Sequence, residues 1–198
     1  KILYHILNKR DNFYCERVFA PWVDMEKLMR EHDIPLYSLE TFTPVGEFDI
    51  VGFTLQYEMS YTNILNMLEL AHIPLTWKER DEVNAPFVVC GGPCAFNPEP
   101  LAPFFDLVAL GDGEKETHDI IDCYLAWKQT GAPKDEFLRM AAKIDGVYVP
   151  ALYDIAYNDD GTVASIRPKE GSGAPEVCFK ALVNDLTAAD YPEKIIVP

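Results

Sequence analysis

The sequence lacks a long apolar run, and this shortage argues against a membrane-spanning protein. A helix needs about 20 consecutive apolar residues to cross a bilayer. Even the apolar stretch 101–110 is interrupted by Pro103 and Asp106. The chain opens on Lys1-Ile-Leu-Tyr-His with no small-residue cleavage site behind it. We therefore expect no membrane partner and no signal peptide.

Basic residues are also scarce, which disfavours partners that carry phosphate. The 198 residues include 17 Lys and Arg against 32 Asp and Glu, for a formal net charge of −15. A nucleic-acid-binding protein needs a cluster of basic side chains to release counterions from the phosphate backbone. No window of the sequence provides one, so we expect neither a nucleic-acid partner nor an anionic membrane surface.

Cysteines and histidines are too few and too dispersed for a recognisable metal or disulfide motif. The five cysteines are Cys15, Cys90, Cys94, Cys123 and Cys178. Their odd number and scatter do not form a disulfide framework, which predicts a reducing, cytoplasmic location. The four histidines show no metal-ligand spacing, so we predict no metal site and no catalytic residue.

The remaining composition is that of a globular protein, with 48% hydrophobic residues arranged in a clear pattern. Continuous apolar runs are typical of strands buried on both faces of a parallel sheet; they occur at 49–55, 86–90 and 106–110. Apolar residues at helical spacing predict helices at 2–7, 21–31, 60–73 and 114–128. Weaker patterns indicate short strands at 14–20 and 34–38. The alternation predicts an α/β fold with a doubly wound parallel sheet.

Two of these helices carry specific signals. Pro21 stands where a helix begins, and the apolar face that follows consists of Trp22, Met25, Leu28 and Met29. Ser60 is expected to cap the helix that ends before Pro74.

After residue 131 the sequence pattern changes from long helices and buried strands to shorter elements. We expect a short helix begun by Pro133, and a hairpin turn at 158–161. Short strands are predicted at 147–149, 152–157 and 162–166. Residues 168–175 have the composition of a linker. The predicted organisation is therefore an α/β domain at 1–131, a small mixed extension at 132–167, and a linker and connector at 168–198.

The pair Cys90 and Cys94 raises the question of an iron–sulfur cluster. A cluster with an open iron for S-adenosylmethionine is held by three thiolates, usually in a C-x3-C-x2-C loop. Here Asn97 occupies the third position, and Cys90 lies at the end of a strand predicted to be buried. We interpret both thiols as small apolar side chains near a strand end. A small enzyme that uses one of them as a nucleophile is the lowest-ranked alternative.

Glycine-rich turns follow two of the predicted strands, at Gly91-Gly92 and at 111–114. Ligands of α/β sheets bind at the carboxyl ends of the strands, and glycine lets the backbone approach a ligand closely. Neither turn is a dinucleotide or nucleoside-triphosphate motif. The acidic residues at the second turn also repel phosphate. Plain tight turns remain the alternative interpretation.

Taken in order, these segments resemble the cobalamin-binding-type N-terminal domain of radical SAM enzymes. The resemblance is carried by Val51-Gly-Phe-Thr-Leu, by Val88-Val-Cys-Gly-Gly-Pro-Cys-Ala-Phe-Asn-Pro-Glu-Pro-Leu and by Phe105-Asp-Leu-Val-Ala-Leu-Gly-Asp-Gly-Glu. In that family the third strand ends in a Gly-x-Ser/Thr turn, the fourth in Gly-Gly-Pro and the fifth in Gly-Glu-Gly-Glu. The opening Ile-Leu-Tyr-His-Ile-Leu-Asn is similar to one uncharacterised branch.

The resemblance implies a flavodoxin-like, Rossmann-like sheet with a cofactor over its strand ends. The residues that would bind the cofactor are Thr54, Leu55, Gly91, Gly92, Pro93, Gly111, Asp112, Gly113 and Glu114. The cofactor would be cobalamin, bound without a histidine ligand, since the cobalt-ligating Asp-x-His-x-x-Gly string does not occur here. A partial (β/α) barrel of the parent chain, carrying a 4Fe-4S cluster and S-adenosylmethionine, would follow Pro198.

We therefore expect this chain to position a cobalamin or a substrate over that barrel, without catalytic activity of its own. The alternative is a docking or substrate-presenting module that has the same fold and no cofactor. On the cofactor hypothesis, Gly92→Val abolishes cobalamin binding and leaves the fold largely intact.

Overall fold

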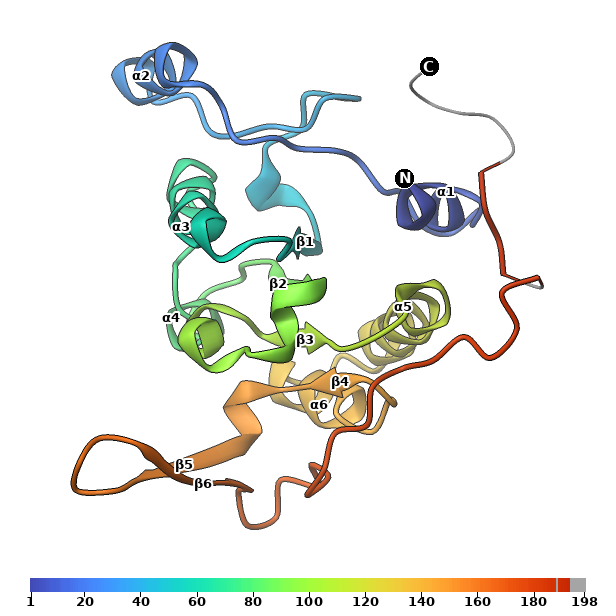
Figure 1. Ribbon diagram of the computed structural model, residues 1–198. Coiled ribbons are helices and arrows are strands. Elements are labelled where there is room, and N and C mark those ends of the chain that lie inside the picture. The colour runs from blue at the N-terminus through green and yellow to red at the C-terminus, as the bar shows by residue number, and fades with distance from the viewer. Residues whose placement is uncertain (188, 193–198) are drawn as a thin grey trace.

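The computed structural model describes residues 1–187 and 189–192. A four-stranded sheet stands in the middle of the molecule with helices on both of its faces (Figure 1). The strands of this sheet are β1 (Ile50–Thr54), β2 (Phe87–Gly91), β3 (Leu107–Ala109) and β4 (Val147–Tyr148). The helices are α1 (Ile2–Asn8), α2 (Val23–His32), α3 (Tyr61–Leu70), α4 (Trp77–Asp81), α5 (Gly113–Thr130) and α6 (Lys134–Ala141). Short 3-10 helices occur at Val45–Glu47, Glu58–Ser60, Pro93–Phe96, Glu99–Phe104 and Pro150–Leu152.

The sheet has the order β1-β2-β3-β4 and is mixed. β1 pairs with β2 in parallel, β2 pairs with β3 in parallel, and β4 runs antiparallel to β3. The α/β class is therefore confirmed, whereas the prediction of a wholly parallel sheet is wrong. Because β1, β2 and β3 share one direction, the segments that leave their carboxyl ends meet at one edge of the sheet.

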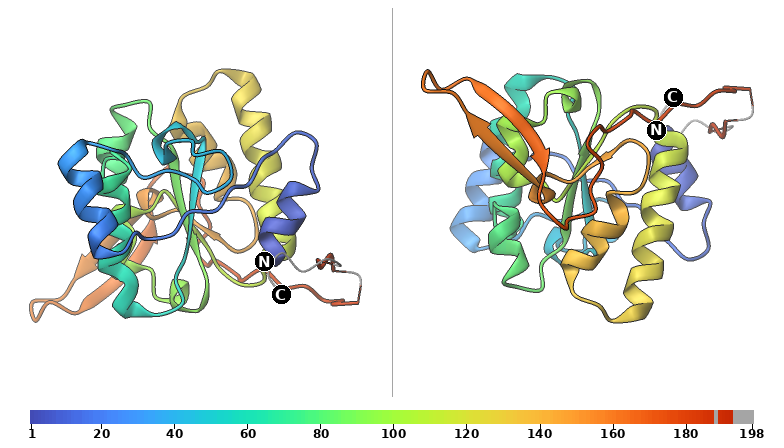
Figure 2. Two further views of the ribbon diagram at one scale, coloured as in Figure 1. Left: turned by 90° about the horizontal axis from the view of Figure 1, so that it is seen from above. Right: turned by 90° about the horizontal axis from the view of Figure 1, so that it is seen from below.

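The helices form a layer on each face. α3 and α4 lie on one side of the sheet, and α1, α5 and α6 lie on the other (Figures 1 and 2). α2 is joined to α3 by polar contacts, in which Arg30 donates to Asn66 at 2.6 Å and Asn66 donates to Glu26 at 2.9 Å. α1 packs on α5 through Ile6, Leu7 and Ile121.

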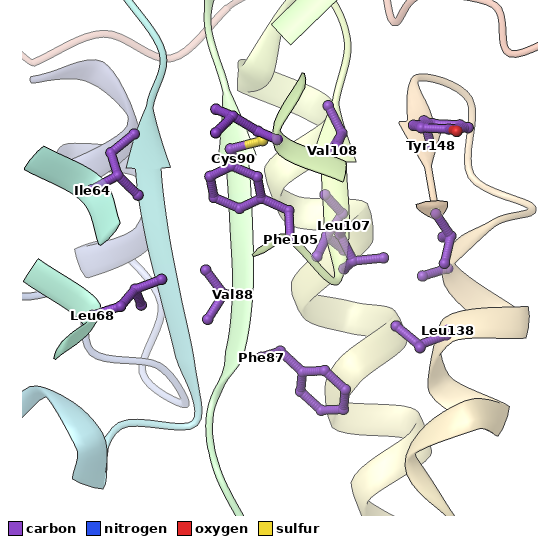
Figure 3. Close-up of a cluster of buried hydrophobic side chains, with 14 of the residues drawn as sticks. Ile64, Leu68, Phe87, Val88, Cys90, Phe105, Leu107, Val108, Leu138 and Tyr148 are labelled. Carbon is purple, nitrogen blue, oxygen red and sulfur yellow. The ribbon is translucent and has the colours of Figure 1, made fainter. Parts of the chain in front are cut away.

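The core is centred on β2 and β3, as Figure 3 shows. Val88 and Leu107 are fully buried, since helices cover both faces of these strands. An aromatic cluster closes one end of this core, where the ring of Phe87 lies 4.6 Å from Phe137 and contacts Tyr124 and Trp127. Phe137 is fully buried as well, so α6 belongs to the same core as the sheet.

The expected burial of β1 on both faces is wrong. Within the described residues β1 pairs with β2 alone, so it is an edge strand, and Gly52 and Thr54 are exposed. An apolar run is typical of a buried strand, but burial also depends on whether a neighbour covers the strand, which the run itself does not specify.

Four smaller expectations are also corrected. Residues 14–20 form an extended segment without a ladder partner, and 34–38 contribute only an isolated bridge between Tyr37 and Pro44. Of the apolar face predicted for α2, only Met29 is buried, while Trp22 is 79% exposed. The hydroxyl of Ser60 donates to Tyr57 O at 2.7 Å and makes no cap bond to α3.

Beyond β4 a two-stranded hairpin projects from the body (Figure 1). It consists of β5 (Tyr153–Tyr157) and β6 (Val163–Pro168), and it confirms the turn predicted at 158–161. The chain then returns past the N-terminal end of α5 and close to α1 (Figure 2). There Lys9 Nζ, just after α1, and Asp190 Oδ1 form an ion pair at 2.6 Å. Part of the predicted connector, at 188 and 193–198, lies outside the described residues. No helix among the described residues is long and apolar enough to span a membrane.

Candidate functional site

The nine residues predicted to bind a cofactor lie along one edge of the sheet, at the carboxyl ends of β1, β2 and β3. Thr54 ends β1, Gly91 ends β2, and residues 111–114 link β3 to α5. Cys90 in β2 pairs with Val108 in β3, so the carboxyl ends of these two strands lie side by side. Cofactor binding by these residues stays a prediction. The contacts that each residue makes within the protein decide which of them remain accessible to a ligand.

The turn after β2 is locked to the end of β1. The Leu55 amide donates to Gly91 O at 2.7 Å, and the Cys94 amide donates to Leu55 O at 2.9 Å. Leu55 is fully buried, whereas Thr54 is exposed and its hydroxyl accepts from Gln56 at 2.6 Å. Of these residues, Thr54 therefore offers its side chain to solvent and Leu55 does not.

The backbone hydrogen bonds between this turn and Leu55 require glycine at position 92. Its φ is +108°, a region that side-chain-bearing residues rarely adopt. A Cβ there would lie 3.0 Å from Leu55 O and 3.1 Å from Leu55 N. The missing side chain thus makes room for the protein's own backbone, and this contact argues against the expectation that Gly92→Val leaves the fold intact. Pro93, which follows, is exposed and is the first residue of a 3-10 turn.

The turn after β3 is hydrogen-bonded to the C-terminal segment of the chain. Gly111 forms a parallel bridge with Ala181, and a Cβ on Gly111 would lie 2.2 Å from Ala181 O. The Asp112 amide donates to Ala181 O at 3.0 Å, and its carboxylate accepts from the Val183 amide at 2.8 Å. We call residues 181–183 the strap. The strap therefore pairs with the backbone at Gly111, which stays exposed, and binds the Asp112 carboxylate.

The other two residues of this turn begin α5. A Cβ on Gly113 would lie 3.1 Å from the side chain of Leu3, because α1 packs against this point. Glu114 is half-buried in the first turn of α5. Asp112 is the N-cap of the helix but makes no side-chain cap bond to it, since its carboxylate binds the strap instead.

Glu116 is the functional candidate that sequence reasoning missed. Its side chain is only 2% exposed, Oε1 accepts from the Leu110 amide at 3.3 Å, and Oε2 has no partner among the described residues. Burial raises the pKa of this carboxyl to about 7. A charged residue on the buried face of an otherwise amphipathic helix is the signal that could have found it.

Glu116 also lies directly beneath the strap. A Cβ on Gly146 would lie 2.6 Å from Glu116 Oε1 and 2.9 Å from Cβ of Ala181. Gly146 therefore contacts both the Glu116 carboxyl and the strap. An ionisable group is therefore built into the contact between the sheet edge and the C-terminal segment.

The two cysteines do not fit an iron–sulfur centre. Cys90 is 2% exposed and points into the core, where burial raises the pKa of its thiol. Cys94 lies in the loop beyond it, beside Glu58 and Tyr61. No group of three or more His, Cys, Asp or Glu among residues 1–187 and 189–192 is arranged to hold a metal ion. No chemical step through a cluster is assigned to these residues.

The sequence comparisons establish the family. The family described as radical SAM proteins, N-terminal, matches residues 1–150. The chain belongs to this family. Its match includes α6 and β4 and so runs past the boundary predicted at residue 131.

A curated relative of this radical SAM N-terminal chain is an uncharacterized protein from Methanocaldococcus jannaschii. The two are 34% identical over 86 residues, which cover 43% of this chain and 18% of the relative. The match thus spans less than a fifth of the relative's length. No solved structure matches the chain.

Proposed function

We propose that this chain is a positioning module, whose sheet edge holds the radical SAM domain of the parent protein or the substrate of that domain. Membership of the N-terminal family of radical SAM proteins supports the association with such a domain. The observation that favours docking over cofactor binding is that two glycine tips contact the protein itself. Gly92 packs on the backbone of Leu55, and Gly111 packs on Ala181.

The surface offered for docking consists of apolar side chains on two loops at this edge. Tyr57 is 58% exposed, Met59 is 74% exposed and Phe96 is 59% exposed. The loops that carry them are joined by the bond from the Cys94 amide to Leu55 O. Gatherings of exposed large apolar side chains on soluble proteins commonly mark interaction sites.

The strap supports the choice of the parent chain's own domain as the occupant. Its hydrogen bonds to Leu110 and Asp112 bring the C-terminal segment back to the edge that carries the exposed loops. We propose that a partial barrel with a 4Fe-4S cluster and S-adenosylmethionine lies against this edge in the parent protein. The chain's residues would orient and shield that site and would supply neither thiolates nor an acid–base pair.

A photo-crosslinker placed in the full-length parent protein tests this proposal. With p-benzoylphenylalanine in place of Phe96, we expect crosslinks to residues of the radical SAM domain, identified by mass spectrometry. The matched control carries the same group in place of Tyr157 on the projecting hairpin, which is similarly exposed at 63%. The docking face would be refuted if the group at position 96 formed no crosslink to the radical SAM domain. It would also be refuted if the groups at positions 96 and 157 crosslinked to that domain equally.

Cobalamin binding is a second candidate, supported by the family resemblance and by the exposed surface beside Thr54 and Pro93. Titration of the purified chain with hydroxocobalamin separates the two candidates. The docking proposal predicts an unchanged cobalamin spectrum and no co-elution on gel filtration at high micromolar ligand. A shifted spectrum that is lost in Thr54→Tyr would favour the cofactor.

We further propose that the fold is a flavodoxin-like variant, supported by its three parallel strands and its helices on both faces. The division into a domain, an extension and a connector also stays a proposal. Since α6 and β4 share the core and the sheet, we place the end of the module near residue 150.

A further inference from the structure

A cavity of about 340 Å³ lies at the opposite edge of the sheet from the glycine turns. Phe87, the first residue of β2, and Asp106, which precedes β3, both line it, so it sits at the amino ends of these strands. Figure 3 shows Phe87 and Leu138 toward this end of the sheet and Cys90 toward the other. The volume lies within the range of about 300–1,000 Å³ that is typical of small-molecule sites.

The half-buried part of its wall is cationic, in a protein whose net charge is −15. Lys134, Arg139 and Lys169 all line the cavity and are half-buried. A fourth cation, Arg80, is fully buried and adds no net charge, because it forms an ion pair with the buried Asp106 at 3.0 Å. Three positive side chains therefore converge on one small space.

These cations are held in place by main-chain carbonyls. Lys134 Nζ donates to Ala85 O at 2.8 Å and to two further carbonyl oxygens. Arg139 donates to Gly171 O at 2.9 Å, and Lys169 donates to Ala151 O at 2.8 Å. Arg139 Nε also forms an ion pair with the exposed carboxylate of Asp135 at 3.6 Å, so part of its charge is balanced. Carbonyl oxygens orient a cation without cancelling its charge. Consistent with this, burial lowers the pKa of Lys134.

Two of the cations keep donors for a ligand. Among the described residues Lys169 Nζ has the single acceptor Ala151 O, and Nη2 of Arg139 has none within hydrogen-bonding distance. Besides Asp106, which pairs with Arg80, the carboxylates around the cavity are Asp81, Asp135 and Glu170. All three belong to exposed residues, where water and salt screen them more than the half-buried cations.

The rest of the wall is apolar, formed in part by Trp77 and Leu138. We propose that this cavity binds a small organic anion, whose carboxylate or phosphate meets Lys169 and Arg139 and whose flat apolar part lies against Trp77. Charge-assisted bonds from lysine and arginine suit such an oxyanion. The indole ring supplies a flat apolar surface for the rest of the ligand.

Isothermal titration calorimetry of the whole chain with phenyl phosphate, benzoate and inorganic phosphate tests this site. We expect at least one ring-bearing anion to bind saturably with a Kd of about 1 mM or below. Inorganic phosphate should bind about tenfold more weakly, since it lacks the apolar part. The ratio between phenyl phosphate and benzoate distinguishes a phosphate from a carboxylate ligand.

Lys169→Gln removes the charge and retains an amide donor for Ala151 O, so the local fold is preserved. It should weaken binding about tenfold or more. Lys115→Gln, on the exposed face of α5, is the matched control and should leave binding unchanged. Absence of saturable binding by all three anions up to 10 mM overturns the proposal, as does equal binding by the wild type and Lys169→Gln.

If Lys169→Gln does not fold, Trp77→Leu is measured in its place. We expect this variant to lose the preference for ring-bearing anions over inorganic phosphate. An unchanged preference would refute the proposal.

Discussion

Glu116 is a buried carboxyl whose ionisation opposes folding. Its pKa is raised to about 7 mainly because burial penalises the charged form, and the nearby charge of Asp119 adds to the effect. Since the folded state holds this proton more tightly than the unfolded state does, stability falls as pH rises from about 4.5 to 7. The loss is on the order of 3 kcal/mol when the shift is converted at about 1.4 kcal/mol per pKa unit.

Glu116→Gln should remove this pH dependence. We expect the variant to be more stable than the wild type at pH 8 and to differ little from it at pH 5, as measured by urea denaturation at both values. Glu114→Gln, two residues away and less buried, is the control and should follow the wild type. The free energy of unfolding of Glu116→Gln is subtracted from that of the wild type at each pH. A difference that stays flat or rises between pH 5 and 8 would contradict the assigned burial.

Gly92 illustrates what sequence can and cannot predict about a single residue. The Gly-Gly-Pro string correctly located a turn after β2, because glycine and proline mark chain reversals. It did not specify what approaches the glycine. Only the fold brings the Leu55 backbone to within 3.0 Å of the position where a Cβ would stand.

Gly92→Ala should therefore destabilise the chain by about 1–3 kcal/mol, because the new side chain is strained at φ +108° and crowds Leu55. Gly52→Ala, at a position with open space, is the control and should cost less than about 1 kcal/mol. Chemical denaturation of both variants measures the difference. Equal stabilities would mean that the turn is free to relax.

At the scale of elements, the strap is held by short-range backbone contacts that a single methyl group disrupts. Gly111→Ala places a Cβ only 2.2 Å from Ala181 O, so we expect residues 181–183 to detach while the sheet stays folded. Hydrogen exchange of the Asp112 and Val183 amides should accelerate, because both lose their acceptors.

Gly173→Ala is a matched control for this experiment. Gly173 also has a positive φ, +74°, but open space around it. The Gly173→Ala variant has the same kind of backbone strain without a clash. Its Asp112 and Val183 amides should therefore exchange at the wild-type rate. Acceleration in both variants alike would assign the effect to strain and refute the strap.

Elements with long or strongly apolar patterns were predictable, and those determined by neighbours were not. The 18-residue α5 and the buried β2 follow directly from their apolar residues. The five-residue α4 was missed, although Thr76 and Glu79 form a capping box that marks its start. The direction of β4 depends on how α5 and α6 return the chain to β3, which no local pattern specifies.

At the scale of the molecule, the aromatic cluster joins the two sides of the predicted boundary at residue 131. Removal of α6 would expose Phe87 and leave a large cavity where Phe137 stands, and loss of such a ring alone costs about 3–5 kcal/mol. A chain that ends after Gly131 should therefore fail to unfold cooperatively on heating. A chain that ends after Pro175 should unfold in one transition, and a cooperative 1–131 fragment would restore the original boundary.

The central claim is that the carboxyl edge of the sheet is a covered face in the parent protein. Hydrogen–deuterium exchange of the isolated chain and of the full-length parent protein, compared peptide by peptide, tests it most directly. We predict slower exchange in the parent for peptides containing residues 56–61 and 93–97, with unchanged exchange in the β5–β6 hairpin. Identical exchange at 56–61 and 93–97 in the two proteins would contradict the claim.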